Sequence, residues 1–367
     1  MTKQRLNNIF FFVGVAAVVV MLFTFDISFA ELWQHLCRAG YWLVPIIGIW
    51  AVVYAINAWS WWCIIRSQEK KDEIENPNSV NLKSLSPESV NRKSVNRKSV
   101  SPLRVYRLTI TGYALNYATP VGGLGGEPYR ILELSKDIGT ERATSSVILY
   151  AMMHIFSHFW FWFTSVFLYL ALAAIGDMPF TTAIGITFVV ITAFCLLAFY
   201  VFSKGYRKGL VVRMIRWTGK LPGLKRWSAR FLDNHEESLR NVDHQIAALH
   251  GQDKRAFYNS LLLEYFSRVV QSLEIMFMLL LFDIDCGGGL SGLTLTFLHS
   301  ILILALTSLL ANLLGFLPMQ LGVQEGGFVV STAAMGLSAA MGIFIGIICR
   351  VREIIWIFIG MMLMKLK

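Results

Sequence analysis

Two short stretches rich in glycine and proline, far apart in the chain, place the strongest constraint on its fold. In each stretch a proline and a glutamate stand at the same spacing, Pro120 to Glu127 and Pro318 to Glu325. The full stretches are Thr119-Pro-Val-Gly-Gly-Leu-Gly-Gly-Glu-Pro-Tyr-Arg130 and Pro318-Met-Gln-Leu-Gly-Val-Gln-Glu-Gly-Gly-Phe328. Glycine and proline interrupt regular secondary structure, so each stretch predicts a turn.

The surrounding sequence places these turns inside a membrane. Hydrophobic residues make up 55% of the chain and charged residues only 15%, which indicates an integral membrane protein. The apolar segment before the first turn, Val105–Ala118, is about 14 residues long, whereas a spanning helix needs roughly 20. We therefore expect a re-entrant hairpin there, with its free backbone groups facing protein or a polar cavity.

The pairing of the two stretches suggests an internal repeat. An asparagine lies shortly upstream of each one, at Asn116 and Asn312. Segments broken by glycine or proline at matching places in two halves mark the binding site of an inverted-repeat transporter, near the bilayer midplane. The alternative is two unrelated loops between ordinary helices.

The remaining apolar segments predict an all-α helical bundle with about six full spans and two opposed re-entrant hairpins in an inverted repeat. The expected spans are Ile9–Phe25, Tyr41–Ile65, Thr144–Ile175, Phe180–Val201, Ala256–Phe282 and Ile343–Leu366. A signal peptide ending near Ser28-Phe29-Ala30 is an alternative for the first of them. Because Leu293–Leu317 is long enough to cross a bilayer, eight full spans is an alternative topology.

Two polar segments interrupt this single membrane domain, which covers residues 1–367. Residues 66–102 contain the repeat Ser-Val-Asn-Arg-Lys at 89–93 and 94–98, so we expect a flexible, low-complexity insert. Residues 203–255 form a basic loop. The positive-inside rule places both segments, and both chain termini, in the cytoplasm of a cell with the protein in its plasma (inner) membrane. The net charge of +10 then reflects contact with anionic lipid rather than nucleic acid.

Charged residues also occur within the expected spans. Glu264, Arg268, Gln271 and Glu274 follow one face of a helix, and Arg350, Arg352 and Glu353 stand in the last span. Charges inside a membrane are costly and usually face the bundle interior, so we expect these side chains to line a cavity. For Glu264 and Arg268, a purely structural ion pair is the alternative.

No metal or cofactor site is indicated. His154 and His158 stand four residues apart but lack the glutamate of the zinc-protease pattern, so they are interpreted as polar side chains facing the interior. The five cysteines have neither metal-ligand nor disulfide-framework spacing; they are Cys37, Cys63, Cys195, Cys286 and Cys349.

Two opposed hairpins meeting near the midplane would enclose a polar pocket. Glycine turns and helix N-termini offer N–H groups to an anion, and the arginines add full positive charges. Glu127 and Glu325 are available to pair with arginines or to bind a cationic group. Such a mixture suits a polar lipid head group. The candidate site residues are Asn116, Gly122, Gly123, Gly125, Gly126, Glu127, Arg130, Glu264, Arg268, Gln271, Pro318, Gly322, Gln324, Glu325, Arg350 and Arg352.

At these residues the chain resembles the flippase-like membrane domain of the lysylphosphatidylglycerol synthase (multiple peptide resistance factor) family. The resemblance rests on Thr119–Arg130, on Leu317–Glu325 and on Arg350, and it covers nearly the whole chain except residues 66–102. It implies movement of an aminoacylated or other phospholipid between leaflets. The residues that it assigns to this task are Gly122 to Glu127, Arg130, Pro318, Gly322, Glu325 and Arg350. No soluble synthase domain follows the last span, so we do not expect synthesis of aminoacyl lipid.

Three functions follow as hypotheses. The first is translocation of a polar phospholipid or related lipid, without a cofactor. The second is a membrane enzyme acting on a lipid-linked substrate, with Glu127 or Glu325 as general base. The third is a scaffold that binds a partner through its basic segments.

Overall fold

The protein is a bundle of helices in the parts of the chain that the structure describes. The structure is a computed structural model and describes residues 37, 40–75, 99–118, 125–207, 239, 254–282, 284, 289–313 and 323–365. A 3-10 turn, η1 (Gly40–Trp42), leads into the first helix. The helices are α3 (Leu43–Glu75), α4 (Pro102–Ala118), α5 (Gly126–Ile138), α6 (Thr140–Ala174), α7 (Thr182–Arg207), α10 (Lys254–Leu281), α11 (Gly289–Leu313), α12 (Val323–Ala334) and α13 (Ala339–Lys365).

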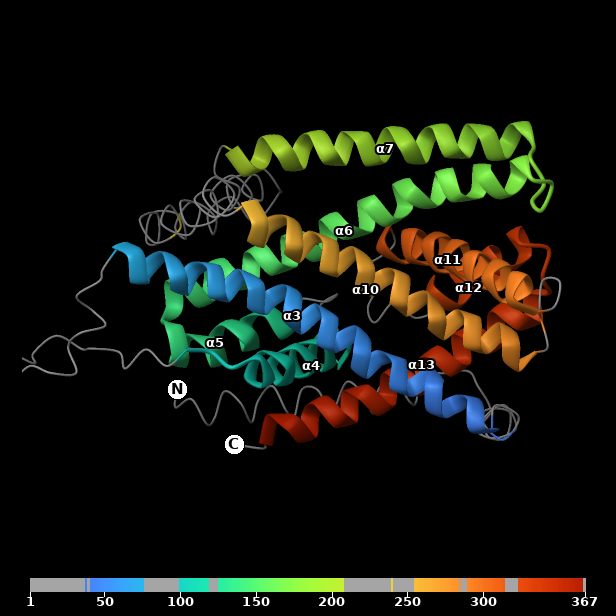
Figure 1. The fold of residues 1–367 in the computed structure, drawn as a ribbon. Coiled ribbons are helices and arrows are strands. Elements are labelled where there is room, and N and C mark those ends of the chain that lie inside the picture. Colours follow the sequence, from blue (N-terminus) through green and yellow to red (C-terminus); the bar gives the residue numbers. More distant parts are fainter. Residues whose placement is uncertain are drawn as a thin grey trace, which may run out of the picture.

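Five long helices run along the length of the bundle: α3, α6, α7, α10 and α13 (Figure 1). By length and composition alone, four helical segments in the described parts of the chain qualify as membrane spans: Gly40–Glu69, Thr140–Ala174, Thr182–Ser203 and Gly289–Leu313. α10 and α13 are 28 and 27 residues long and carry the buried charges described below. At about 1.5 Å per residue, each exceeds the hydrocarbon thickness of a bilayer.

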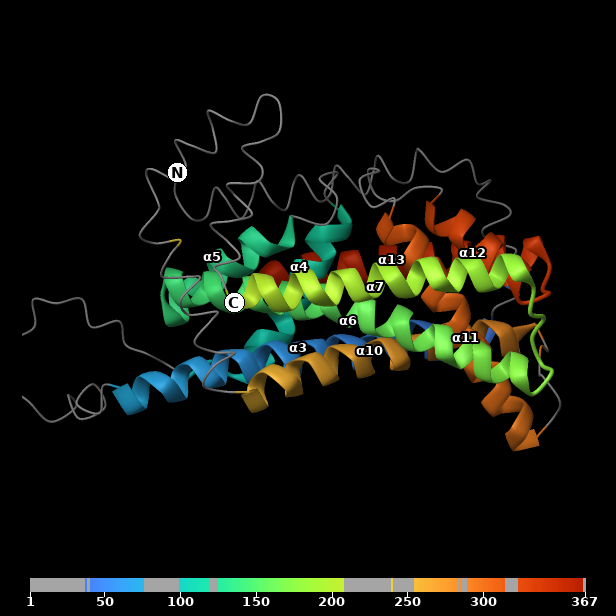
Figure 2. The ribbon, with the colours of Figure 1, turned by 90° about the horizontal axis from the view of Figure 1, so that it is seen from above.

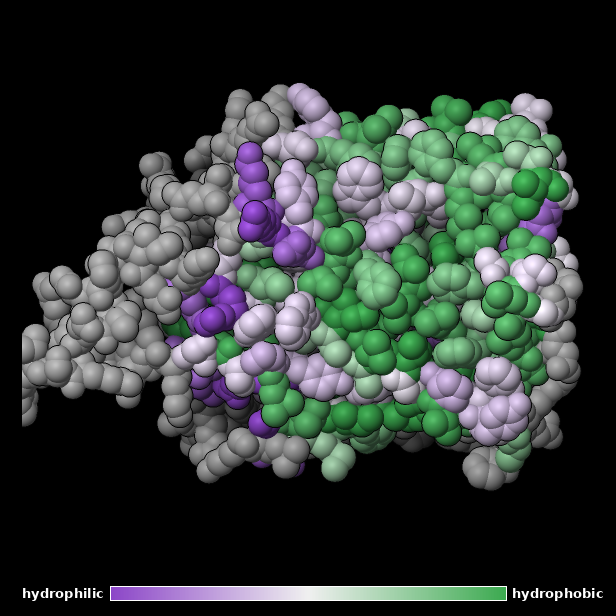
Figure 3. All heavy atoms as spheres, in the orientation of Figure 1, coloured by the Kyte–Doolittle hydropathy of each residue, from purple (hydrophilic) through white to green (hydrophobic). Residues whose placement is uncertain are grey.

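The outer surface fits a bilayer. Hydrophobic residues cover the middle and right of the face in Figure 3, and hydrophilic residues gather at its left, where α3 ends and α10 begins. Helix α7 contributes many of the exposed apolar side chains, including Val189, Leu197 and Val201. An all-α membrane bundle, as predicted from the hydropathy pattern, is therefore confirmed.

Two helical hairpins occupy opposite ends of the bundle. α4 and α5 lie in the left half and α11 and α12 in the right half, in two views at right angles (Figures 1 and 2). Their breaks fall at the two glycine- and proline-rich stretches, whose turns (119–124 and 314–322) lie outside the described residues. Helix α11 extends over 25 residues and is tilted within its half, so its length alone does not make it a full crossing of the bundle.

The packing partners of the helices follow an inverted repeat. α3 packs on α4, α4 on α5 and α5 on α6; in the second half, α10 packs on α11, α11 on α12 and α12 on α13. Two cross-contacts match as well, because α4 packs on α13 and α11 packs on α6, whereas the contacts of α6 with α3 and α10 have no counterpart of similar extent at α13. α3 and α10 pack against each other and run in opposite directions, as an inverted repeat requires of its first helices.

Small residues let these helices approach closely. A Cβ atom built on Gly360 of α13 would lie 2.4 Å from the Cβ of Ala114 in α4. One built on Gly342 would lie 2.5 Å from the Cα of Val329 in α12. In a membrane, helix association depends on such close packing rather than on the hydrophobic effect. Both hairpins therefore pack closely against α13 at its glycine residues.

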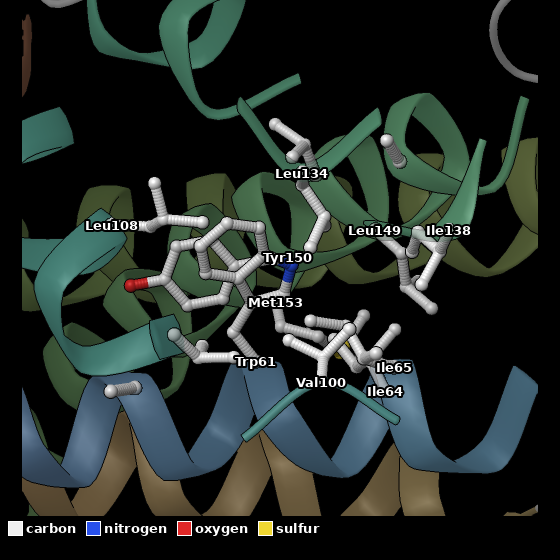
Figure 4. Packing of buried hydrophobic residues seen from close by; sticks show 14 of the residues in the cluster. Trp61, Ile64, Ile65, Val100, Leu108, Leu134, Ile138, Leu149, Tyr150 and Met153 are labelled. Atoms are coloured by element: carbon white, nitrogen blue, oxygen red, sulfur yellow. The ribbon is translucent and has the colours of Figure 1, made fainter. Parts of the chain in front are cut away.

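The first hairpin is fixed to the bundle by an apolar cluster from α3, α5 and α6. Trp61 of α3 stacks on Tyr150 of α6 with ring centroids 5.5 Å apart. Leu134 and Ile138 of α5 close the cluster from the other side (Figure 4). Because Trp61 and Tyr150 are fully buried here, this cluster holds the return arm of the hairpin against two spanning helices.

Some predicted boundaries differ from the structure. Helix α3 continues past the expected end at Ile65 to Glu75, so the first residues of the predicted insert are helical. Arg66 and Glu69 form an ion pair on this extension, which stabilises a polar helix end. The expected span Ile9–Phe25 and nearly all of the basic loop at 203–255 lie outside the described residues.

Candidate functional site

A cavity of about 460 Å³ lies at the centre of the bundle, where the two hairpins face each other. This is within the usual volume range of small-molecule sites, about 300–1,000 Å³. Eight helices contribute to its wall, including all four hairpin arms. The polar lining residues are Asn57, Tyr113, Asn116, Tyr117, Glu127, Arg130, Tyr150, His154, His158, Glu264, Ser267, Arg268, Gln271, Glu274, Thr307, Ser308, Asn312, Gln324, Arg350 and Arg352.

Asn116 joins the two arms of the first hairpin. Its amide nitrogen donates to Oε1 of Glu127 at 3.0 Å, and its amide oxygen accepts from the backbone N–H of Gly126 at 2.6 Å. The first N–H groups of a helix have no partner within it, so this contact satisfies one of them at the start of α5. Glu127 follows in the first turn, where a negative charge is favourable.

Arg130 lies one turn further along α5, in a cage of aromatic rings. Its guanidinium carbon is 4.8 Å from the ring centroid of Tyr113, 5.4 Å from that of Tyr150 and 5.8 Å from that of Trp61. It also donates to Oε1 of Glu127 at 3.2 Å. Cation–π contacts are strongest when desolvated, so the buried cage stabilises a full positive charge beside the cavity.

The second hairpin is bound to α13 by a buried arginine. Nε and Nη2 of Arg350 donate to the two carboxylate oxygens of Glu325 at 2.6 and 3.2 Å, while Nη1 donates to Glu353 at 2.9 Å. Glu325 stands in the first turn of α12, as Glu127 does in α5. The positive end of each return helix thus already faces a carboxylate of the chain itself.

A second buried arginine connects α13 with α10 and α3. Nε and Nη2 of Arg352 donate to Glu274 at 2.8 and 3.4 Å, and its guanidinium carbon lies 3.9 Å from the ring centroid of Trp50. The indole N–H of Trp50 donates to the same carboxylate at 2.8 Å. Such two-point pairing fixes geometry as well as charge, so this side of the cavity is tightly organised.

Glu264 and Arg268 have other partners than each other. Nδ1 of His154 lies 2.7 Å from Oε2 of Glu264, and Arg268 donates to the Ser157 hydroxyl and the His154 carbonyl at 2.8 and 2.7 Å. The structural ion pair that was the alternative for Glu264 and Arg268 is therefore not observed among the described residues. Both side chains contact α6 because α10 packs against it.

Most of the sequence-derived candidates meet around this cavity. Gly125 and Gly126 form the start of α5, and Glu325 stands behind Arg350. Gly122, Gly123, Pro318 and Gly322 lie outside the described residues. The candidates that line the cavity are Asn116, Glu127, Arg130, Glu264, Arg268, Gln271, Gln324, Arg350 and Arg352.

The sequence interpretation missed the aromatic cage and gave no special role to His154. Tyr113, Tyr150 and Trp61 come from three different helices, and aromatic residues are common throughout the chain. A signal was present nevertheless, since Tyr150 and His154 are four residues apart and therefore on one helix face. The role of Gly112 is visible only in the structure. A Cβ there would lie 2.1 Å from Nε of Arg130, so only glycine leaves room for the guanidinium.

The fold and the cavity define a polytopic helical membrane protein. Charged residues from both halves of the bundle line its central cavity. Comparison with family models identifies this class more closely. The model described as "Lysylphosphatidylglycerol synthase TM region" matches residues 11–360, and the chain belongs to this family. Its membership gives it a lipid-related membrane function. Searches of curated proteins and of solved structures found no match.

Proposed function

We propose that the protein moves a polar lipid, a phospholipid or a related lipid, between the leaflets of a cell membrane. One observation carries the proposal: a single cavity touches both hairpins, each of which enters from a different end of the bundle. A head group bound there would need only one hairpin to move in order to reach either leaflet. The acyl chains would remain in the surrounding lipid.

The wall of the cavity supports a head group as the occupant. Arg130 and Glu127 of the first hairpin and Arg350 of α13, which pairs with Glu325 of the second hairpin, stand at or beside the cavity, so phosphate and amine groups would each find an opposite charge. No step requires a cofactor or a soluble partner. We place the chain in the plasma membrane with both termini in the cytoplasm, on the strength of the basic segment at 203–255.

The test is a leaflet assay in proteoliposomes that contain phosphatidylglycerol or phosphatidylethanolamine with a fluorescent acyl chain. Dithionite destroys the dye in the outer leaflet only, so protein-dependent loss beyond that leaflet measures translocation. Glu127→Gln removes a charge-assisted contact worth about 1.5–3 kcal/mol. We expect the rate to fall about 10- to 100-fold, since 1.4 kcal/mol corresponds to tenfold.

Glu141→Gln is the matched control, because Glu141 is exposed in the first turn of α6 and does not line the cavity. It should translocate at the wild-type rate. A wild-type rate in folded Glu127→Gln would remove the first hairpin from the translocation path. Mass spectrometry of the same lipids separates transport from catalysis, because a transporter leaves their masses unchanged.

A further inference from the structure

One part of the cavity wall holds a histidine in contact with a carboxylate. His154 of α6 and Glu264 of α10 meet there, with Nδ1 and Oε2 2.7 Å apart. At this distance one proton lies between the two atoms, as an imidazole N–H donating to a carboxylate. A second proton would bind at the other imidazole nitrogen or at Oε1 of Glu264. The pair can therefore hold one proton or two.

The pair has unused acceptor capacity on its buried member, Glu264. The side chain of Glu264 is 1% exposed, and its Oε1 has no hydrogen-bond partner among the described residues. The same holds within those residues for Nδ1 of His158, whose ring lies 5.5 Å from that of His154. Asn57 Oδ1, Glu127 Oε2 and Arg130 Nε at the same cavity likewise have no partner among those residues, so this polar space has groups available to water, a ligand or a proton.

Five helices, α3, α4, α5, α6 and α10, place polar or charged side chains beside the pair. Tyr113 of α4 is 3.2 Å from Nδ1 of His154, and Tyr150 and His158 flank that ring on α6. The positive charges are Arg268 of α10, bonded to the His154 carbonyl, and Arg130 of α5, in contact with Tyr113 and Tyr150. From α3, the neutral side chain of Asn57 lines the same region.

The charges around the cavity are not balanced without an added proton. Among the described residues, Glu127, Glu264, Glu274, Glu325 and Glu353 stand against Arg130, Arg268, Arg350 and Arg352. Three of these glutamates line the cavity; with Glu325 and Glu353, which pair with Arg350 from behind its wall, one carboxylate is in excess when the histidines are neutral. An uncompensated charge in a membrane interior is costly, so binding one proton lowers the energy of the empty cavity.

The opposite half of the repeat has a permanent charge at the matching place. The same number of residues separates Glu127 from His154 as separates Glu325 from Arg352. His154 pairs with Glu264 of α10, and Arg352 pairs with Glu274 of the same helix. Arginine does not release its proton in proteins, whereas histidine titrates in the physiological range. Among the described residues that line the cavity, histidines occur on α6 alone.

We infer that the His154–Glu264 pair is a proton-binding site that couples translocation of the lipid head group to movement of a proton. This inference rests on the proposed function. In each cycle the pair takes one proton from one side of the membrane and releases it to the other. Only O–H or N–H bonds form and break, and the lipid is the other participant.

The experiment uses the same proteoliposomes with an imposed gradient of one pH unit. Valinomycin and equal potassium on both sides hold the membrane potential at zero. In the wild type, the steady-state leaflet ratio of the fluorescent phosphatidylglycerol or phosphatidylethanolamine should shift in opposite senses for the two gradient directions. For one proton per lipid the shift reaches about tenfold per pH unit. If the lipid is translocated but its leaflet ratio is the same under both gradients, the inference is overturned and the proposed function stands.

Two carboxylate-to-amide variants locate the response. Glu264→Gln should abolish the shift of the leaflet ratio. Asp177→Asn is the matched control, because Asp177 also contacts a histidine, His299, at 2.6 Å and does not line the cavity. It should respond as the wild type does. An unchanged response in Glu264→Gln would show that the proton binds elsewhere.

A second measurement examines the site without lipid movement. Infrared spectra of the purified full chain, titrated between about pH 4 and 10, should contain a pH-dependent band of the pair, either a carboxyl C=O band or an imidazolium ring band, that Glu264→Gln lacks or shifts. Absence of both a carboxyl band and an imidazolium band of the pair in the wild type would overturn the inference whatever the transport result. If the band is present but no lipid moves in the wild type, the proposed function fails and the proton site stands.

Discussion

Replacing Arg350 with leucine is expected to lower the free energy of unfolding by about 3–5 kcal/mol, the cost of removing one partner from a buried ion pair. The variant would leave Glu325 and Glu353 facing each other without the guanidinium that now bonds to both. Arg352 is 3.7 Å from Glu353 and would compensate only that second carboxylate. Unfolding in mixed detergent micelles, followed by tryptophan fluorescence, measures the loss.

Arg66→Leu provides a closely matched comparison. Arg66 and Glu69 form the same kind of pair, three residues apart at 2.9 Å, as Arg350 and Glu353 do. The side chain of Arg66 is 47% exposed, however, against 5% for Arg350. An exposed pair contributes about 0–1 kcal/mol, so Arg66→Leu should change stability little. Equal losses in the two variants would contradict the role of burial.

Replacing Gly126 with alanine should disrupt the first hairpin. The added Cβ would lie 2.1 Å from the carbonyl oxygen of Gly112 and 2.9 Å from the amide oxygen of Asn116. Because the nearest atom belongs to the backbone, α4 and α5 must separate, at a cost of about 1–3 kcal/mol or more. The Asn116 contact with Glu127 would be lost as well. We expect translocation to fall at least as far as in Glu127→Gln.

The second hairpin offers the control for this substitution. A Cβ on Gly326, in the first turn of α12, meets no atom within 4 Å. Gly326→Ala should therefore keep the wild-type stability to within about 0.5 kcal/mol, or gain slightly from the higher helix propensity of alanine. Both variants are compared in the unfolding and leaflet assays. Similar losses of stability and translocation in the two variants would mean that steric space at the start of the helix does not explain the effect of Gly126→Ala.

The sequence was informative about the fold because the hairpins leave a local signature. Pro120 to Glu127 and Pro318 to Glu325 share a spacing, and the structure places both breaks between paired helices in opposite halves of the bundle. Helix ends were harder to place. The apolar pattern of α3 stops at Ile65, whereas hydrogen bonding and the Arg66–Glu69 pair carry the helix further.

The candidate site was predictable only in part, for a physical reason. Intramembrane charges stand out in a sequence, so Arg350, Arg352 and the α10 stripe were found from their cost alone. Which partner each charge takes depends on how helices distant in sequence approach one another. Glu264 bonds to His154, 110 residues away, rather than to Arg268 on its own helix. No periodicity in a single segment contains that information.

The unequal chemistry of the two halves also sets the resting state of the empty protein. In an inverted repeat with identical halves, a two-fold rotation would relate the two end states, and they would have equal energy and equal occupancy. Here Arg130 lies among aromatic rings, whereas Arg350 is bonded to two carboxylates. Opening the first hairpin therefore requires a different free energy from opening the second. Cysteine labelling from each side, at position 116 and at position 312, should accordingly give unequal rates. This difference in free energy determines to which side of the membrane the empty protein is open most of the time. Accumulation of the lipid in one leaflet needs a separate driving force, because a difference between resting states cancels over a complete cycle.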